Sequence, residues 1–193
     1  MKRRNPGQEE AIIEVTLIPE TWIIAPLVTE QQLRRWYEKG WINDEDLHLD
    51  RSAGWLTHPH SPGRAFPRSA DGRPIIFKLW LLAPMKRACD KLGYSRSVLG
   101  FSIIDDHGFP VEYVEIPDQP LKYRRVILGP KQSTEYFEYI DSTYELKFRV
   151  KTRYPKEFCE ILNAAGRIGL MARSGKGFGK FRVSFKVETL KNQ

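Results

Sequence analysis

The stretch that decides the fold runs from residue 166 to residue 183 and reads Gly-Arg-Ile-Gly-Leu-Met-Ala-Arg-Ser-Gly-Lys-Gly-Phe-Gly-Lys-Phe-Arg-Val. It lies between a pattern typical of a helix and a pattern typical of a strand. Its glycines permit positive φ and the close approach of a ligand, and its cations stand beside backbone N–H groups. We therefore predict a phosphate-binding loop formed by Arg173, Gly175, Lys176, Gly177, Gly179 and Lys180. The alternative is a basic turn that binds nothing.

Regular patterns flank this loop on both sides. Before it, Pro155 stands where a first helical residue is expected, and an apolar stripe over residues 158–165 ends near Gly166. Residues 144–151 alternate apolar and charged side chains, and residues 181–188 alternate apolar and polar or charged side chains after the loop. Such alternation predicts half-buried strands. The loop is thus expected to join a helix to the last strand.

The remainder of the chain carries further strand and helix patterns. They predict strands at 13–17, 102–106, 110–116 and 122–128, a capped helix at 29–40, and a core helix at 75–93 that Pro84 kinks or begins. The resulting order predicts a ferredoxin-like α+β fold (β-α-β-β-α-β), an antiparallel sheet with both helices on one face. We expect one domain over 1–193, an insertion of a helix and an irregular loop at 19–74, and a possible hairpin insertion at 105–122.

Positive charge is concentrated toward the end of the sequence. The net charge is +7, and residues 149–193 contain eleven Lys or Arg against three Glu, a net of +8. A local basic region of this kind predicts a polyanionic partner such as nucleic acid. Lys147, Arg149 and Arg182 are expected on the free face of the sheet as a track for a single strand, with Lys86 and Arg87 on the rim of the core helix. The alternative is an ordinary hydrated surface.

Other features argue against a membrane protein or a metalloprotein. No apolar run reaches the length of a bilayer span, and no apolar signal core follows the basic first residues. His58-Pro59-His60 has no second ligand pair at structural-zinc spacing, and the two cysteines lie far apart among apolar neighbours. We expect a cytoplasmic protein without a metal or cofactor.

Two segments resemble the RAMP superfamily, the ferredoxin-like RNA-binding proteins of CRISPR effector and RNA-processing complexes. Residues 169–181 resemble that family's terminal glycine-rich loop. Residues 138–150 are similar to the segment that enters the strand before the second helix in the backbone subunits, which bind CRISPR RNA. Together these segments cover the carboxy-terminal third. Residues 77–82 (Phe-Lys-Leu-Trp-Leu-Leu) depart from the small, polar entry to the first helix that backbone subunits show.

The resemblance implies a non-catalytic protein of antiviral defence that holds single-stranded guide or target RNA beside other subunits of a ribonucleoprotein complex. One alternative is a metal-independent endoribonuclease that processes CRISPR RNA, with His48 or His107 as general base. Asp50 is a further weak catalytic candidate, because some backbone subunits cut target RNA with an acidic residue of the long insertion. Another alternative is a solitary or virus-borne relative that docks on an effector complex and interferes with it.

Overall fold

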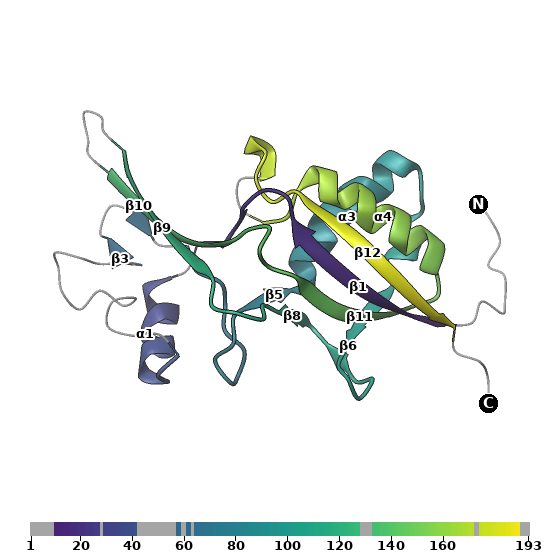
Figure 1. Ribbon diagram of the computed structural model, residues 1–193, viewed down its shortest axis with the longest axis horizontal. Helices are drawn as coiled ribbons and strands as arrows, with labels where there is room; N and C mark the ends of the chain where they lie inside the picture. Colours follow the sequence, from purple (N-terminus) through teal and green to yellow (C-terminus); the bar gives the residue numbers. More distant parts are fainter. Residues whose placement is uncertain are drawn as a thin grey trace.

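A five-stranded antiparallel sheet forms one half of the molecule (Figure 1). The structure is a computed structural model that describes residues 10–27, 29–41, 57–58, 61–62, 64–127, 133–171 and 174–189. The strand order is β12-β1-β11-β6-β7. These strands are β1 (Ala11–Pro19), β6 (Phe101–Ile104), β7 (Pro110–Val111), β11 (Leu146–Thr152) and β12 (Phe181–Thr189).

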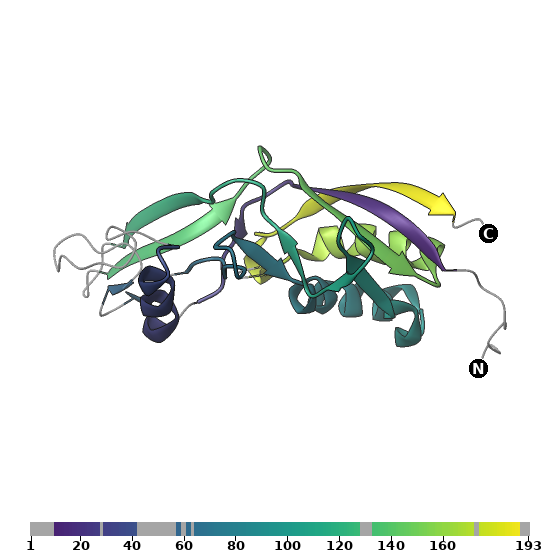
Figure 2. The same ribbon diagram turned by 90° about the horizontal axis from the view of Figure 1, so that it is seen from below.

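Two helices cover one face of this sheet and leave the other face open (Figure 2). They are α3 (Lys78–Leu92) and α4 (Pro155–Ile168), which pack on each other. Along β1, buried residues alternate with half-buried ones, because successive side chains of a strand point to opposite faces. The order β1, α3, β6, β11, α4, β12 confirms the predicted ferredoxin-like arrangement with both helices on one face.

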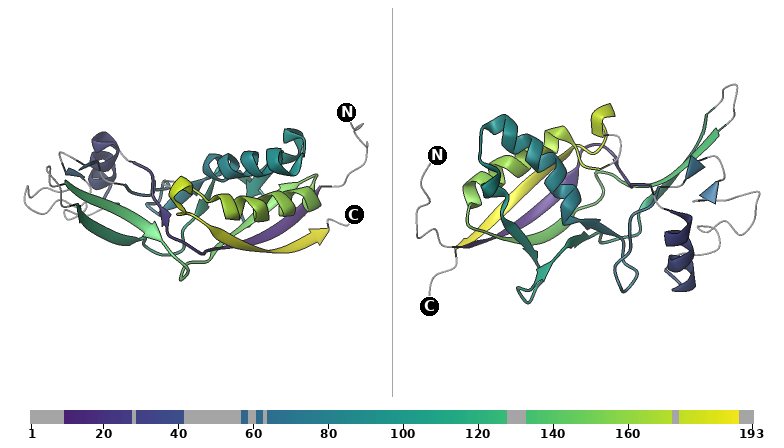
Figure 3. Two further views of the ribbon diagram at one scale, coloured as in Figure 1. Left: turned by 90° about the horizontal axis from the view of Figure 1, so that it is seen from above. Right: turned by 180° about the vertical axis from the view of Figure 1, so that it is seen from behind.

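A second, smaller sheet lies at the other end of the molecule (Figures 1 and 3). It has the order β2-β10-β9. Its strands are β2 (Ile23–Ile24), β9 (Leu121–Ile127) and β10 (Ser133–Ile140), and beside it lie α1 (Glu30–Glu38), β3 (Thr57–His58) and β4 (Ser61–Pro62). Thr29 caps α1 as predicted, since its side chain accepts a hydrogen bond from the Gln32 backbone N–H.

Further short elements complete the fold. The strand β5 (Ile75–Phe77) pairs with β8 (Tyr113–Glu115), and two 3-10 turns, η1 (Arg96–Leu99) and η2 (Ser174–Lys176), follow α3 and α4. Among the described residues, no helix combines the length and the apolar character needed to cross a bilayer.

The start of the core helix differs from the sequence prediction. Residues 75–77 form a strand rather than the first helical turn, because Ile76 is fully buried opposite Val114 of β8. Pro84 therefore lies inside α3 and does not mark its beginning. The helix buries Met85, whereas Leu79 is 66% exposed.

A buried ion pair fastens the segment after β4 to β10. Arg68 Nη2 lies 2.8 Å from Glu138 Oε1, and both side chains are almost fully buried. The Phe66 backbone N–H donates to Glu138 Oε2 at 2.8 Å, and Arg68 Nη1 donates to the Phe66 carbonyl at 2.8 Å. Arg68 Nε is buried without a hydrogen-bond acceptor among the described residues. The pair thus spans 70 residues of sequence and organises the second sheet.

Candidate nucleic-acid interface

Two glycines of the glycine-rich loop are packed against the protein's own backbone. A Cβ added at Gly166 would lie 2.1 Å from the Phe181 carbonyl oxygen, and one added at Gly179 would lie 2.1 Å from the Leu170 carbonyl oxygen. The Leu170 N–H in turn donates to the Gly179 carbonyl at 2.8 Å. These positions need glycine because one stretch of backbone lies directly on another. The space beside them is therefore not free for a ligand.

The loop is also tied to the turn that follows β1. The backbone N–H groups of Glu20 and Thr21 donate to the Lys180 carbonyl at 2.8 and 3.2 Å. The Thr21 hydroxyl donates to the Gly177 carbonyl at 3.1 Å and accepts from the Lys180 N–H at 2.9 Å. These contacts hold the loop backbone at Gly177 and Lys180. We call residues 174–177 the tip of the loop.

The tip is the open part of the loop. A Cβ added at Gly175 or Gly177 would meet no atom within 4 Å, and Gly177 has φ +88°. Lys176 and Lys180 are exposed and, among the described residues, neither has a carboxylate partner. Arg173, predicted as a third cation here, lies outside the described residues. The tip and the adjoining Lys180 therefore combine accessible backbone with positive charge that no carboxylate of the described residues offsets.

Aromatic side chains lie beside the loop, between it and the second sheet. Trp22 stacks on Tyr139 with ring centroids 4.4 Å apart, and its ring lies 5.4 Å from Tyr123 and 6.4 Å from Phe178. The Gly179 N–H donates to the Trp22 carbonyl at 2.8 Å, which fixes the tryptophan against the loop. We did not predict this aromatic group from the sequence, because its members are spread from residue 22 to residue 178.

The free face of the central sheet carries the basic residues that the alternation predicted, but most of them are paired. Lys186 Nζ lies 3.3 Å from a Glu14 carboxylate oxygen, and Lys147 Nζ lies 3.0 Å from Glu145. Arg149 Nη1 is 3.5 Å from the Asp105 carbonyl oxygen. Arg182 is exposed and has no carboxylate partner among the described residues.

Neighbouring pairs extend this compensation along the same face. Lys151 Nζ lies 2.7 Å from Glu10, and Arg153 Nε lies 3.2 Å from the same carboxylate. Hydrogen bonding to Lys151 lowers the pKa of Glu10, so this carboxylate stays charged and offsets the cations at neutral pH. The sheet face is therefore an ion-paired surface and much less basic than its Lys and Arg residues alone suggest.

Lys86 and Arg87 lie on the outward side of α3, where both are exposed without a carboxylate partner among the described residues. Because the helices cover one face of the sheet, this rim lies on the opposite side from Lys147 and Arg149 (Figure 2). The structure thus does not bring all the predicted basic residues together on one surface.

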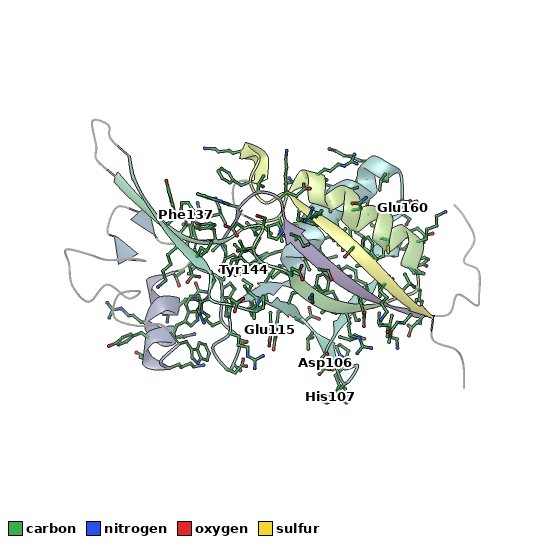
Figure 4. The ribbon with its side chains drawn as sticks, in the orientation of Figure 1. Asp106, His107, Glu115, Phe137, Tyr144 and Glu160 are labelled. Atoms are coloured by element: carbon green, nitrogen blue, oxygen red, sulfur yellow. The ribbon has the colours of Figure 1, made fainter. Side chains whose placement is uncertain are left out.

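Of the three catalytic candidates, His107 is the one that lies within the described residues. His107 lies in the turn between β6 and β7, beside Asp106, and this turn projects from the body (Figure 4). Its backbone N–H donates to Asp105 Oδ1 at 2.9 Å. The strand β7 is at the opposite edge of the sheet from β12, into which the glycine-rich loop leads. His48 and Asp50 lie outside the described residues.

The described residues also include no group of three or more His, Cys, Asp or Glu side chains that could hold a metal ion. Burial raises the pKa of the Cys159 thiol to about 11, which disfavours the thiolate that metal ligation or nucleophilic attack requires.

Known proteins resemble the chain in fold rather than in sequence. No family model matches it, and no curated protein matches its sequence. Solved structures do resemble it, and the first of them, with a TM-score above 0.5, confirms the resemblance at the level of the fold alone. A chain of the type III-B Cmr-beta, determined by cryo-EM bound to cognate target RNA, has a TM-score of 0.55 and 14% identity.

The match to Cmr-beta covers 94% of this chain and 61% of that chain, so this protein spans less than two thirds of its length. Cmr6 from Pyrococcus furiosus has a TM-score of 0.36 and 11% identity over 90% of this chain and 98% of that one. Csc2 from Thermofilum pendens has a TM-score of 0.34 and 10% identity over 97% of this chain and 69% of that one.

Proposed function

We propose that the protein binds single-stranded RNA, guide or target, as a non-catalytic subunit of a CRISPR-associated ribonucleoprotein. The tip of the glycine-rich loop is its principal phosphate contact. One observation carries this proposal: Lys176 and Lys180 are exposed without acidic partners among the described residues, whereas three lysines of the sheet face, Lys147, Lys151 and Lys186, are each paired with a carboxylate. Uncompensated cations attract phosphate more strongly than cations whose charge a neighbouring carboxylate offsets.

The loop geometry suits a phosphate for a second reason. Its base is fixed by backbone contacts, so the tip is held in place while Gly175 and Gly177 leave room for a close approach. Backbone N–H groups and cations that converge in this way contact phosphates without reading sequence. The aromatic group beside the loop includes Tyr123, which is 36% exposed, and exposed aromatic rings are surfaces on which unpaired bases stack.

A pair of matched lysine variants tests the proposal. Lys176→Ala/Lys180→Ala is expected to weaken RNA binding similarly across sequences. It should also lower the slope of log affinity against log salt by about 1.4, because each phosphate that a lysine neutralises contributes roughly 0.7 to that slope. The control Lys147→Ala/Lys186→Ala removes the same charge from the ion-paired face and should change the slope less. Equal affinity and salt dependence for the wild type and the loop variant would show that these two lysines do not contact the RNA.

The role of the backbone is tested separately by two valine substitutions that retain every charge. Gly177→Val should weaken binding, because a β-branched residue resists the φ of +88° and reshapes the tip. Gly108→Val is the control, because Gly108 is also open and held at a positive φ, +84°, but lies in the turn between β6 and β7, away from the loop. If both variants bind RNA like the wild type, phosphate binding does not depend on the conformation of the tip.

We also propose that the protein does not cleave the RNA it binds. The assay is incubation with end-labelled single-stranded RNA with and without magnesium. Intact RNA under both conditions is the expected result. Cleavage that disappears in a His48→Ala, Asp50→Ala or His107→Ala variant would contradict the proposal and identify the residue responsible.

A further inference from the structure

The last strand of the central sheet has one unpaired edge. β12 is nine residues long and pairs with β1 along its whole length on one side, while among the described residues no strand pairs with its other side. An edge of this kind presents a row of free N–H and C=O groups to any strand that can pair with it. β12 contains no proline, the residue that most directly prevents such pairing.

Two antiparallel copies of β12 have complementary side chains: opposite charges face each other, and so do apolar residues. We propose that two copies of the protein associate by antiparallel pairing of their β12 strands about a two-fold axis at Phe185, so that their five-stranded sheets join into one. In this register Arg182 of each copy lies opposite Glu188 of the other. An isologous contact of this kind is the usual basis of a closed homodimer.

The charges select this register over its neighbours. Moving the axis by one residue in either direction centres the pairing on Ser184 or on Lys186. An axis at Ser184 places Arg182 opposite Lys186, and an axis at Lys186 places the two Lys186 residues opposite each other. Like charges directly opposite are destabilising. Among these three registers, only the axis at Phe185 places opposite charges of β12 (Phe181–Thr189) across from each other.

The other face of β12 supports the same register. Val183 and Phe185 are partly buried and pack against the core, whereas Val187 is 51% exposed. In the paired strands Val187 of one copy lies opposite Val183 of the other, and the two Phe185 residues lie opposite each other. Cross-strand apolar pairs of this kind stabilise a sheet. The exposed Val187 of each copy thus lies beside the partly buried Val183 of the other.

Arg182 and Glu188 cannot form this pair within one copy. They are six residues apart on one strand, which is roughly 20 Å at the rise of a strand. Glu188 lies 3.8 Å from Lys186 Nζ, and that lysine is closer to Glu14, at 3.3 Å. Lys186 can therefore remain on Glu14 while Glu188 pairs with Arg182 of the second copy.

Charge reversal and its rescue test the proposal. RNA-free protein, freed of nucleic acid by nuclease treatment, is examined by sedimentation equilibrium at low salt. The wild type is expected to form a dimer, Arg182→Glu or Glu188→Arg to weaken it by roughly tenfold or more, and the double exchange Arg182→Glu/Glu188→Arg to restore it. Lys91→Glu is the control, because it reverses an exposed charge on α3 that lies away from β12.

Restoration of the dimer by the double exchange identifies the contact, because residues 182 and 188 can lie opposite each other only when they belong to different copies. A wild type that stays monomeric at every concentration reached, or a dimer that is unaffected by either reversal, would overturn the proposal. Far-ultraviolet circular dichroism of each variant establishes that loss of the dimer is not loss of folding. Since no RNA is present, the outcome is independent of the RNA-binding experiments.

Discussion

Gly166 illustrates how a single residue is constrained by the backbone beside it. Replacing a helical glycine with alanine ordinarily stabilises a helix by about 1 kcal/mol. Here the new Cβ would lie 2.1 Å from the Phe181 carbonyl oxygen, so β12 or α4 must move. We expect Gly166→Ala to lower the free energy of unfolding by about 1–3 kcal/mol, as overpacked sites do. Urea unfolding measures it, and Gly175→Ala, at an open position, should change stability by less than about 0.5 kcal/mol.

The Arg68–Glu138 pair is a second case in which the effect of a residue depends on its surroundings. Arg68→Met removes the buried guanidinium that contacts the Glu138 carboxylate and is expected to lower the free energy of unfolding by about 3–5 kcal/mol. Arg68→Met/Glu138→Leu removes both charges and should cost less than the sum of the two single changes. A double-mutant cycle by urea unfolding measures this coupling. If the changes in free energy of unfolding of the two single variants add up to that of the double variant, the two side chains do not stabilise each other.

At the scale of elements, the sequence predicts strands and helices whose periodicity is strong. The alternation in β1, β11 and β12 and the proline at the start of α4 placed these elements correctly. Short elements are different. The three residues of β5 form a strand only because β8 pairs with them, and no local pattern indicates a partner 38 residues away. β10 was missed although its partner β9 was predicted.

The turn between β6 and β7 allows a prediction at the same scale. Asp105 Oδ1 accepts hydrogen bonds from the backbone N–H groups of His107 and Phe109 at 2.9 and 2.8 Å. Asp105→Ala removes both bonds and is expected to destabilise the protein by about 1–2 kcal/mol. His107→Ala should leave stability nearly unchanged, since its side chain is exposed in that turn. Thermal and urea unfolding of the two variants check this difference, and equal stability would contradict the proposed role of Asp105.

At the scale of the whole molecule, the candidate site could be predicted only in part. The sequence indicates a basic region of net +8 near its end and the glycine-rich loop within it. It gives no sign that Glu10 and Glu14, more than 130 residues earlier, lie beside those cations and offset them. Charge counted along a chain differs from charge displayed on a surface, because the fold decides which residues become neighbours.

The arrangement of the proposed RNA-binding elements leads to a prediction about the form of nucleic acid. Bases can stack on Tyr123 and Phe178 only when they are unpaired, whereas a duplex offers its backbone alone. The protein is therefore expected to bind single-stranded RNA more tightly than duplex DNA of the same length and at the same salt concentration. Competition of each against a labelled single-stranded RNA measures the preference. Equal competition by duplex DNA would point to purely electrostatic binding.

The place of β1 in the sheet also constrains how the protein is made. Its neighbours on both sides, β11 and β12, lie in the last 50 residues, and the turn after β1 is held by Lys180. During translation the first strand therefore emerges long before either partner exists. It cannot pair with either neighbour until residues 146–189 have left the ribosome, so the contacts between the turn after β1 and the glycine-rich loop form only after β12 is made.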